Sequence, residues 1–157
     1  MPGEIEREAS RLVAWDRELR EVHDRLRGAL RVAREAADAD VPGAARDLLL
    51  YCHGFCVALG GHHLGEDRAL FPSLRVAHPQ LAPVIAKLEQ DHAMIASLLG
   101  GLQAAVDAAE PGERLDRHLE GLAAIMESHF RFEERELLGI LSSLELDTDP
   151  RAVFGPL

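Results

Sequence analysis

Residues 51–72 read YCHGFCVALGGHHLGEDRALFP and place His62 four residues before Glu66 in a segment with the composition of a buried helix. An α-helix turns about 100° per residue, so these two side chains lie roughly 40° apart on one face. The same face carries Leu48, Tyr51, Phe55, Leu59 and Leu70. An ionised carboxylate that points into an apolar interface is strongly unfavourable unless it is paired or binds a cation. The stretch therefore predicts a pair of metal ligands on the inner face of a helix.

The same pattern recurs near the C-terminus. Residues 129–138 read HFRFEERELL and align with residues 62–71, which read HHLGEDRALF. Helical periodicity places Glu133 on the face of His129, whereas Glu134 is turned away by about 140° and is expected to be exposed to solvent. The residues that share the face of His129 and Glu133 are Leu115, Leu119, Leu122, Met126, Leu137 and Ile140. Two inward His-x-x-x-Glu pairs in one short chain are hard to explain by core packing alone.

Composition limits the classes of protein to consider. The 157 residues suffice for one domain with its own core, and Ala, Leu, Glu and Arg dominate, which favours helices. A net charge of −10 argues against binding to nucleic acid or to anionic membranes, because both need basic patches. The sequence shows neither a signal peptide nor an apolar run long enough to span a bilayer, so a cytoplasmic protein is expected. Cys52 and Cys56 are expected to be buried, reduced thiols.

Apolar periodicity and helix breakers predict four helices. The first covers residues 4–38, and the break at 40–43 precedes a second over 43–70 that ends at Phe71-Pro72. Pro79 and Pro83 frame the start of a third helix, which ends near Glu110-Pro111-Gly112. A fourth helix follows over about 113–145. We expect one helical domain over residues 1–146 and a short C-terminal tail over residues 147–157, either packed on the domain or loose.

A second internal similarity supports an architecture of two helical hairpins. Residues 19–26 read LREVHDRL and resemble residues 88–95, which read LEQDHAMI, so His23 and His92 occupy equivalent positions. Each lone histidine is then followed, one helix later, by a His-x-x-x-Glu pair. Short connections make sequential helices antiparallel neighbours, which predicts an all-α, up-down-up-down antiparallel four-helix bundle. Its approximate twofold symmetry would bring four histidines and two glutamates to one level of the core.

These residues are the candidate metal ligands. A lone buried histidine is usually an ordinary core residue, but several imidazoles and carboxylates in one core call for a cation. Mixed nitrogen and oxygen donors suit iron, manganese or zinc, and the lack of further thiols argues against a cysteine-rich zinc site. The predicted ligands are His23, His62, Glu66, His92, His129 and Glu133.

The sequence also indicates two residues beside these ligands, His63 and Glu136, and the role of His63 stays open at this point. His63 lies at the edge of the inner face, and it is a further ligand, a residue that contacts a ligand, or a group at a helix interface. Glu136 lies one turn beyond Glu133 on the inner side and is expected to contact and orient a ligand.

The combination resembles the hemerythrin family, specifically the bacterial proteins with a hemerythrin-type His-His-Glu cation-binding domain. The residues that carry the resemblance are His23, His62-His63-x-x-Glu66-Asp67, Asp91-His92 and His129-Phe130-x-x-Glu133-Glu134. The resemblance covers nearly the whole chain. It implies two non-haem iron ions joined by an oxo or hydroxo bridge, with Glu66 and Glu133 as bridging carboxylates and four histidines as terminal ligands. Zinc or manganese are alternatives on the donor atoms alone.

The chain departs from the oxygen-carrying members of that family on the third helix. Those members have a His-x-x-x-His pair there, whereas His92 has Leu88 one turn before it and Ala96 one turn after it. One imidazole is missing unless His63 replaces it, and a missing ligand would leave more positions for a small molecule.

The expected function is therefore that of a cytoplasmic di-iron protein that binds or reduces a small oxidant, namely peroxide, dioxygen or nitric oxide. If it is an enzyme, a peroxidase-like, catalase-like or oxidase activity fits. An iron or oxygen sensor, a carrier, an iron store and a purely structural metal site are the alternatives. No nucleic acid, membrane or particular protein partner is indicated.

Overall fold

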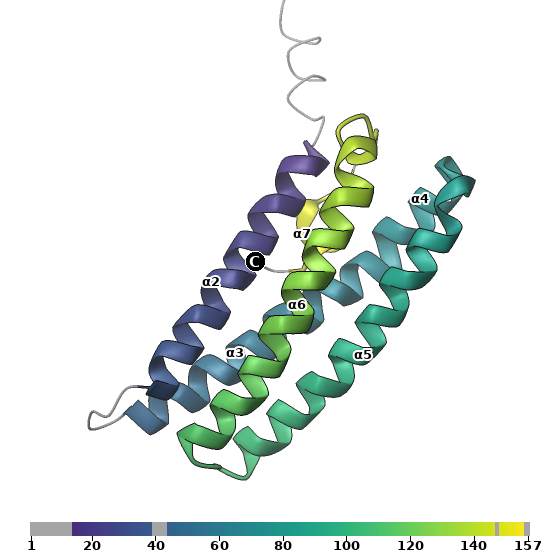
Figure 1. The fold of residues 1–157 in the computed structure, drawn as a ribbon. Coiled ribbons are helices and arrows are strands. Elements are labelled where there is room, and N and C mark those ends of the chain that lie inside the picture. Colours follow the sequence, from purple (N-terminus) through teal and green to yellow (C-terminus); the bar gives the residue numbers. More distant parts are fainter. Residues whose placement is uncertain (1–13, 39–43, 147, 156–157) are drawn as a thin grey trace, which may run out of the picture.

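Helices account for the structure almost entirely. The computed structural model describes residues 14–38, 44–146 and 148–155, and no strand occurs in these ranges. Its four long helices run side by side along one axis (Figure 1). They are α2 (Trp15–Asp38), α3 (Ala44–Gly65), α5 (Ala82–Asp107) and α6 (Gly112–Leu141). The predicted helix over residues 4–13 and the predicted break at 40–43 lie outside the described residues.

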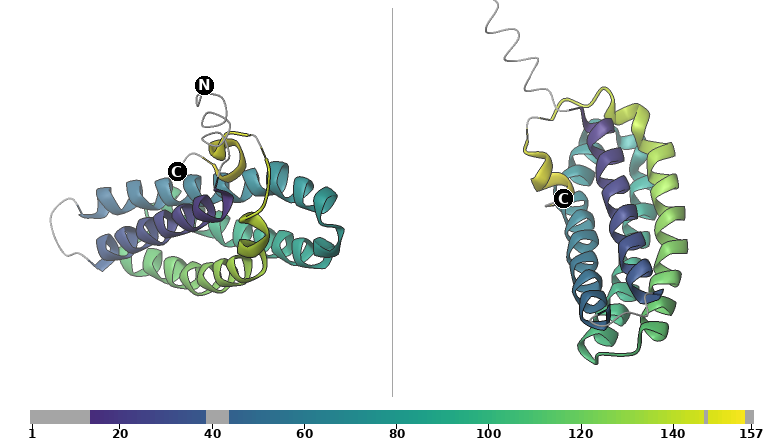
Figure 2. Two further views of the ribbon diagram at one scale, coloured as in Figure 1. Left: turned by 90° about the horizontal axis from the view of Figure 1, so that it is seen from above. Right: turned by 90° about the vertical axis from the view of Figure 1, so that its left-hand side faces the viewer.

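Each long helix buries one stripe of side chains against two neighbours. On α2 the buried positions are spaced by three or four residues, as a period of 3.6 requires. Helix α2 packs on α3 and α6, and α5 packs on the same two helices, so the four close into a ring (Figures 1 and 2). The buried positions of α2 are Trp15, Leu19, Val22, His23, Leu26, Leu30 and Ala33. The buried side chains of the four long helices therefore meet in one core along the middle of the bundle.

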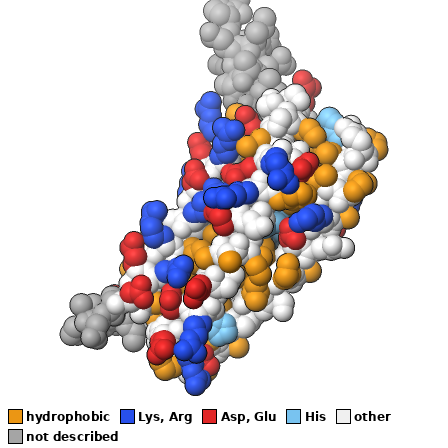
Figure 3. Space-filling model, viewed as in Figure 1, with side chains coloured by type: hydrophobic (Ala, Val, Ile, Leu, Met, Phe, Trp, Pro, Cys, Tyr) orange, Lys and Arg blue, Asp and Glu red, His pale blue; other side chains and the backbone are white. Residues whose placement is uncertain are grey.

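The outer surface carries intermixed charges. Over the face shown in Figure 3, basic and acidic side chains lie close together along α2 and α6. Arg34 Nε lies 3.3 Å from Asp116 Oδ1, a pair that links these two helices. Partly exposed pairs of this kind contribute little to stability, so the fold rests mainly on its core. Tyr51, predicted on the inner face of its helix, is instead 41% exposed.

The second helical segment does not end at Pro72 as the sequence pattern predicts. It continues through a π-helical turn, η1 (Glu66–Leu70), into α4 (Phe71–Ala77). The Phe71 N–H donates to the Glu66 carbonyl, five residues back, and Pro72 then falls in the first turn of α4. A proline is tolerated there because the first N–H groups of a helix need no partner in the helix. The wider turn thus lets the chain stay helical, and it begins at a predicted ligand, Glu66.

Two short elements complete the described chain. A 3₁₀ turn, η2 (Pro79–Leu81), leads into α5, and α7 (Pro150–Phe154) follows α6. Helix α7 returns to pack against α2, α3 and η1 (Figure 2). Its Val153 and Phe154 are buried. The tail predicted at residues 147–157 is therefore packed on the long helices over residues 150–155.

Cys52 is buried and Cys56 partly buried, and both are free thiols. Burial raises the pKa of each thiol to about 11, so both are protonated near neutral pH. None of the helices in the described ranges combines the length and the apolar composition needed to cross a membrane.

Candidate metal centre

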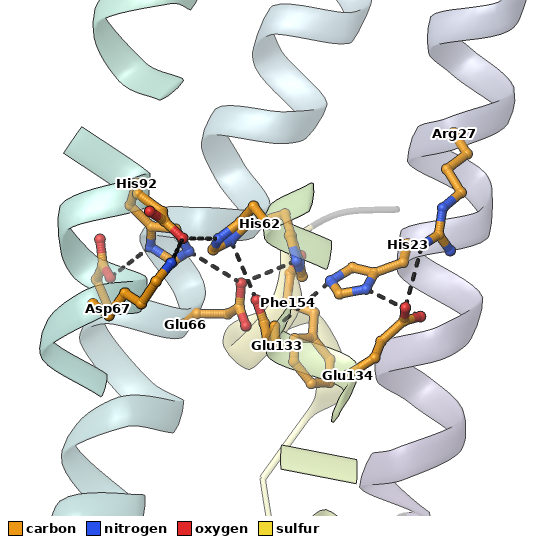
Figure 4. A network of polar contacts seen from close by, with 12 residues as sticks. His23, Arg27, His62, Glu66, Asp67, His92, Glu133, Glu134 and Phe154 are labelled. Atoms are coloured by element: carbon orange, nitrogen blue, oxygen red, sulfur yellow. Dashed lines mark hydrogen bonds and ion pairs between the residues drawn. The ribbon is translucent and has the colours of Figure 1, made fainter. Parts of the chain in front are cut away.

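The buried polar side chains of the described residues form one group. It contains the six predicted ligands and His63, and its members are His23, His62, His63, Glu66, His92, His129 and Glu133. We call these seven residues the His/Glu cluster. They come from α2, α3, η1, α5 and α6, and Figure 4 shows several of them converging between the helices. The six residues predicted to point inward are buried together, and His63, whose role the sequence left open, is buried with them.

The two glutamates lie between pairs of histidines. Glu66 Oε1 is 3.0 Å from His62 Nε2 and 3.7 Å from His92 Nε2. Glu133 Oε2 is 3.3 Å from His129 Nε2, and its Oε1 is 3.9 Å from His23 Nε2. Each carboxylate therefore faces imidazoles from two different helices, an arrangement that permits it to bridge two ions.

His63 joins the cluster through the ring of His92. The two rings stack with centroids 3.9 Å apart and an interplanar angle of 12°, and the ring of His129 lies 5.1 Å away. Potential ligand atoms of these three histidines all lie within 4.8 Å of one another. Of the other positions that flank His92 by one turn, Leu88 is apolar and Ala96 is exposed. His63 thus adds a fifth imidazole to the cluster, beside the one imidazole that the third helix supplies.

The inner nitrogen and oxygen atoms of the cluster lack hydrogen-bond partners among the residues that the structure describes. Within these residues no hydrogen bond reaches either oxygen of Glu66 and Glu133, or Nε2 of any of the five histidines. Buried polar atoms in folded proteins are nearly always hydrogen-bonded, so a group of orphaned donors and acceptors that face one another requires an explanation. A cation with nitrogen and oxygen ligands would satisfy them all at once. The residues present therefore fit a metal.

The outer nitrogens are oriented by groups that the sequence reasoning missed. His92 Nδ1 bonds to Asp67 Oδ1 at 2.8 Å, and His129 Nδ1 bonds to Asp91 Oδ2 at 3.0 Å. Such partners hold a metal-binding histidine in the tautomer whose other nitrogen is free to bind. Asp67 and Asp91 each stand next to a predicted ligand in the sequence, Glu66 and His92, and this adjacency was the available signal.

His62 and His23 have outer partners of other kinds. His62 Nδ1 donates to the backbone carbonyl of Phe154 at 3.0 Å. His23 Nδ1 lies 3.4 Å from Glu134 Oε1, and the His23 ring stacks on Phe130 with centroids 3.8 Å apart. Each partner comes from a different helix than the histidine it holds (Figure 4).

The expectation that Glu134 is solvated is wrong. Its side chain is only 19% exposed, because Arg27 reaches over from α2 and places Nη2 3.2 Å from Glu134 Oε2. The neighbouring His23 imidazole is the main reason that the pKa of Glu134 falls to about 2, with Arg27 adding to the effect. Glu134 is therefore an anion that supports His23 from outside the cluster.

Glu136 is placed differently from the expectation that it contacts a ligand. Its carboxylate is 35% exposed and lies 3.3 Å from Arg135 Nε. The described contacts do not bring Glu136 to the His/Glu cluster, and the role near a ligand falls to Asp67, Asp91 and Glu134.

Burial without a counter-charge shifts the protonation of the cluster. Desolvation raises the pKa of Glu66 to about 7, and it raises that of Glu133, which also faces the charge of Glu66. Desolvation lowers the pKa of His62 to about 4 and holds that of His63 well below its usual value. In the metal-free protein the carboxyls thus tend to be protonated and these imidazoles neutral. A bound cation reverses this preference for the carboxyls.

These residues define a class of protein, a helical metal-binding protein with imidazole and carboxylate ligands. The family model for the hemerythrin HHE cation binding domain matches residues 16–141, and the chain belongs to that family. No curated protein and no solved structure matches the chain significantly. The match begins one residue into α2, covers the rest of the four long helices and ends at the last residue of α6, so α7 lies beyond it. Family membership and the buried cluster together support metal binding, for which iron is typical.

Metal affinity is expected to rise with pH through the neutral range. Because Glu66 has a pKa near 7 in the metal-free protein and must lose its proton to bind an ion, affinity falls at pH values below 7. His62 and His63, with lowered pKa values, are already neutral and add no further proton release there. Zinc affinity should increase at least about tenfold between pH 6 and pH 8, the change that one released proton produces, because the pKa of Glu133 is raised as well. Calorimetry in buffers with different ionisation enthalpies measures that release, and binding at pH 6 without it would contradict the expectation.

Proposed function

We propose that the chain is a hemerythrin-like, non-haem di-iron protein that binds and reduces a small oxidant, with peroxide as the first candidate and dioxygen and nitric oxide as the others. In this proposal the four long helices form the up-down-up-down antiparallel bundle of the family, and α4 and α7 are additions to it. The observation that carries the proposal is the His/Glu cluster, whose inner atoms are buried and have no hydrogen-bond partner in the described part of the chain.

The positions of the side chains support an assignment of ligands to two ions. His63, His92 and His129 form one group within ligand distance of a common ion, and His23, His62 and Glu133 form another. Glu66 faces histidines of both groups, as does Glu133. We assign three imidazoles to one ion, two to the other, and both carboxylates to bridging positions. A set of ligands with only nitrogen and oxygen donor atoms suits both ferrous and ferric iron.

The chain prepares this centre for redox chemistry in two ways. Asp67 and Asp91 hold the outer protons of His92 and His129, which keeps their Nε2 atoms directed inward. The side chains of the cluster are at most 5% exposed, so the protein keeps bulk water away from them. Two iron ions that each change from the ferrous to the ferric state would supply the two electrons that convert one peroxide and two protons into two waters.

Stopped-flow mixing tests the proposal. The ferrous protein is expected to oxidise rapidly in peroxide, with one peroxide consumed for each pair of iron ions oxidised, and added reductant should sustain turnover. Zinc-loaded protein is the control, because zinc has no accessible redox change. Iron that stays ferrous in peroxide, or peroxide loss equal to that of the zinc form, would contradict oxidant reduction.

Reversible oxygen carriage is a second candidate, and the position of His63 favours it. With His63 included, the cluster offers five imidazoles and two carboxylates, so the imidazole missing from the third helix no longer implies an additional open position. Stopped-flow mixing of the ferrous protein with oxygen separates oxygen carriage from oxidant reduction. Oxygen uptake that reverses on removal of oxygen indicates carriage, whereas irreversible oxidation indicates reduction.

His63→Ala is expected to weaken binding of one of the two ions by roughly tenfold to a hundredfold, because it removes one of the three imidazoles grouped on that side. His53→Ala is the matched control. His53 is an exposed histidine on the same helix, with Nδ1 3.3 Å from Gln103 Oε1. Titration of the metal-free variants with zinc measures both affinities. Two ions bound to His63→Ala as tightly as to the control would show that His63 is only a neighbour of the ligands.

A further inference from the structure

The C-terminal segment reaches the His/Glu cluster although it lies outside the family match. We call residues 150–155 the C-terminal cap; it consists of α7 and Gly155. Val153 and Phe154 are fully buried, and the cap packs against α2, α3 and η1. In Figure 4, Phe154 lies beside the His/Glu cluster. The cap is therefore part of the wall around the candidate metal centre.

The cap supplies the outer hydrogen-bond partner of His62. A carbonyl oxygen can only accept, so the bond from His62 Nδ1 to the Phe154 carbonyl places the ring proton on Nδ1. The Nε2 lone pair of His62 is then directed at the cluster, where it lies 3.0 Å from Glu66. Carboxylates of Asp67, Asp91 and Glu134 stand in the equivalent position for His92, His129 and His23. The cap thus supplies an outer partner from beyond the family match, whereas the outer partners of the other three histidines lie within it.

Two glycines allow the backbone of the cap to lie directly on α3. A Cβ atom on Gly65 would lie 2.5 Å from the Val153 carbonyl oxygen. A Cβ atom on Gly155 would lie 2.8 Å from the backbone nitrogen of His62, and Gly155 has a φ of 86°, which disfavours other residues. Any side chain at either position would push the cap away from His62. Contacts of the Trp15 and Asp149 side chains help to hold the cap in this position.

The anchor is an aromatic contact with the start of α2. The rings of Trp15 and Phe154 meet edge to face with centroids 5.7 Å apart. Trp15 Nε1 also donates to the Leu146 carbonyl at 3.1 Å, which fixes the connection between α6 and the cap. Asp149 accepts a hydrogen bond from the Arg151 N–H and caps α7.

We propose that the C-terminal cap is a positioning element of the metal centre, in which the Phe154 carbonyl orients His62 for metal binding and the cap backbone closes the site beside Gly61, His62 and Gly65. This inference rests on the proposed function only in requiring that the cluster binds metal. A neutral carbonyl increases the basicity of an imidazole less than a carboxylate does. The ion held by His62 is consequently the more exchangeable of the two.

Glycine substitutions test the inference in the full-length, zinc-loaded protein. Gly155→Ala and Gly65→Ala displace the cap backbone by different clashes. Gly60→Ala is the matched control. Gly60 lies on the same helix as Gly65, and a Cβ atom there would meet nothing within 4 Å. Two quantities are measured: the rate at which one zinc ion is lost to a chelator, and the solvent exchange of the His62 Nδ1 proton by NMR. The Nδ1 protons of His92 and His129 serve as internal references.

Both cap variants are expected to release the first zinc ion at least about tenfold faster than Gly60→Ala, in line with the loss of an outer partner. Exchange of the His62 proton should accelerate while the His92 and His129 protons are unaffected. Release and exchange rates equal to those of Gly60→Ala, even with a lower melting temperature, would overturn the inference and leave the cap a packing element. A wild-type protein that binds no zinc would instead overturn the metal centre itself.

Discussion

Removal of the metal is expected to lower the free energy of unfolding at pH 7 by about 4–5 kcal/mol, because it leaves two carboxyls and five imidazoles facing one another in the core without a cation. For a chain of this length that corresponds to a fall in melting temperature of roughly 10–15 °C. Thermal unfolding of metal-loaded and chelator-treated protein, followed by circular dichroism, measures the difference.

A carboxamide at Glu66, one of the two proposed bridging residues, provides the control. Glu66→Gln removes a charge that the metal-free protein must bury or neutralise by taking up a proton, so it should raise the melting temperature of the metal-free form. The same substitution should lower the melting temperature in the presence of metal, since a ligand is lost. Equal melting temperatures for metal-loaded and metal-free wild type, or the same sign for Glu66→Gln in both states, would show that these residues do not form one buried metal centre.

Glu133→Ala is expected to abolish binding of both ions at micromolar metal, because Glu133 is fully buried and faces histidines on two sides. Glu134→Ala, one residue further on, should weaken binding by only about tenfold, as expected for loss of a group that orients His23 from outside. Equilibrium dialysis with zinc compares the two variants. If Glu134→Ala empties the site as completely as Glu133→Ala, the assignment of ligands on α6 is wrong.

Helical periodicity predicted the ligand residues of this site, because the direction of each ligand side chain depends only on its own helix. The i, i+4 spacing of His62 with Glu66, and of His129 with Glu133, places each pair on a single face whatever the helix packs against. The internal repeat then paired His23 with His92. The long helices follow from the same apolar pattern, and the structure places all six residues in one buried cluster.

The outer partners of the histidines could not be predicted from periodicity, because they depend on which helices are neighbours. Asp91 holds His129 on α6, and Asp67 holds His92 on α5, so neither pairing has a spacing within one element. Glu134 was predicted to be exposed because its own helix turns it away from His129. That reasoning overlooked α2, which brings both His23 and Arg27 to it.

The π-turn and the C-terminal cap depend on backbone contacts that side-chain patterns do not report. A proline after an apolar run normally marks the end of a helix, but the wide turn at η1 accommodates Pro72 in a new first turn. The cap approaches α3 through Gly65 and Gly155, and the bond to His62 uses a main-chain oxygen. Glycines in a helix and before a terminus are common, so they gave no specific signal.

The iron content of freshly purified protein tests the central claim most directly. We expect two iron ions per chain, measured by elemental analysis against protein concentration, after expression in iron-supplied cells. Substitution of both proposed bridging residues, Glu66→Ala with Glu133→Ala, should reduce the content to background, whereas His53→Ala should leave it unchanged. One ion or fewer per wild-type chain under these conditions, or iron retained by the doubly substituted protein, would contradict a two-ion centre built from the His/Glu cluster.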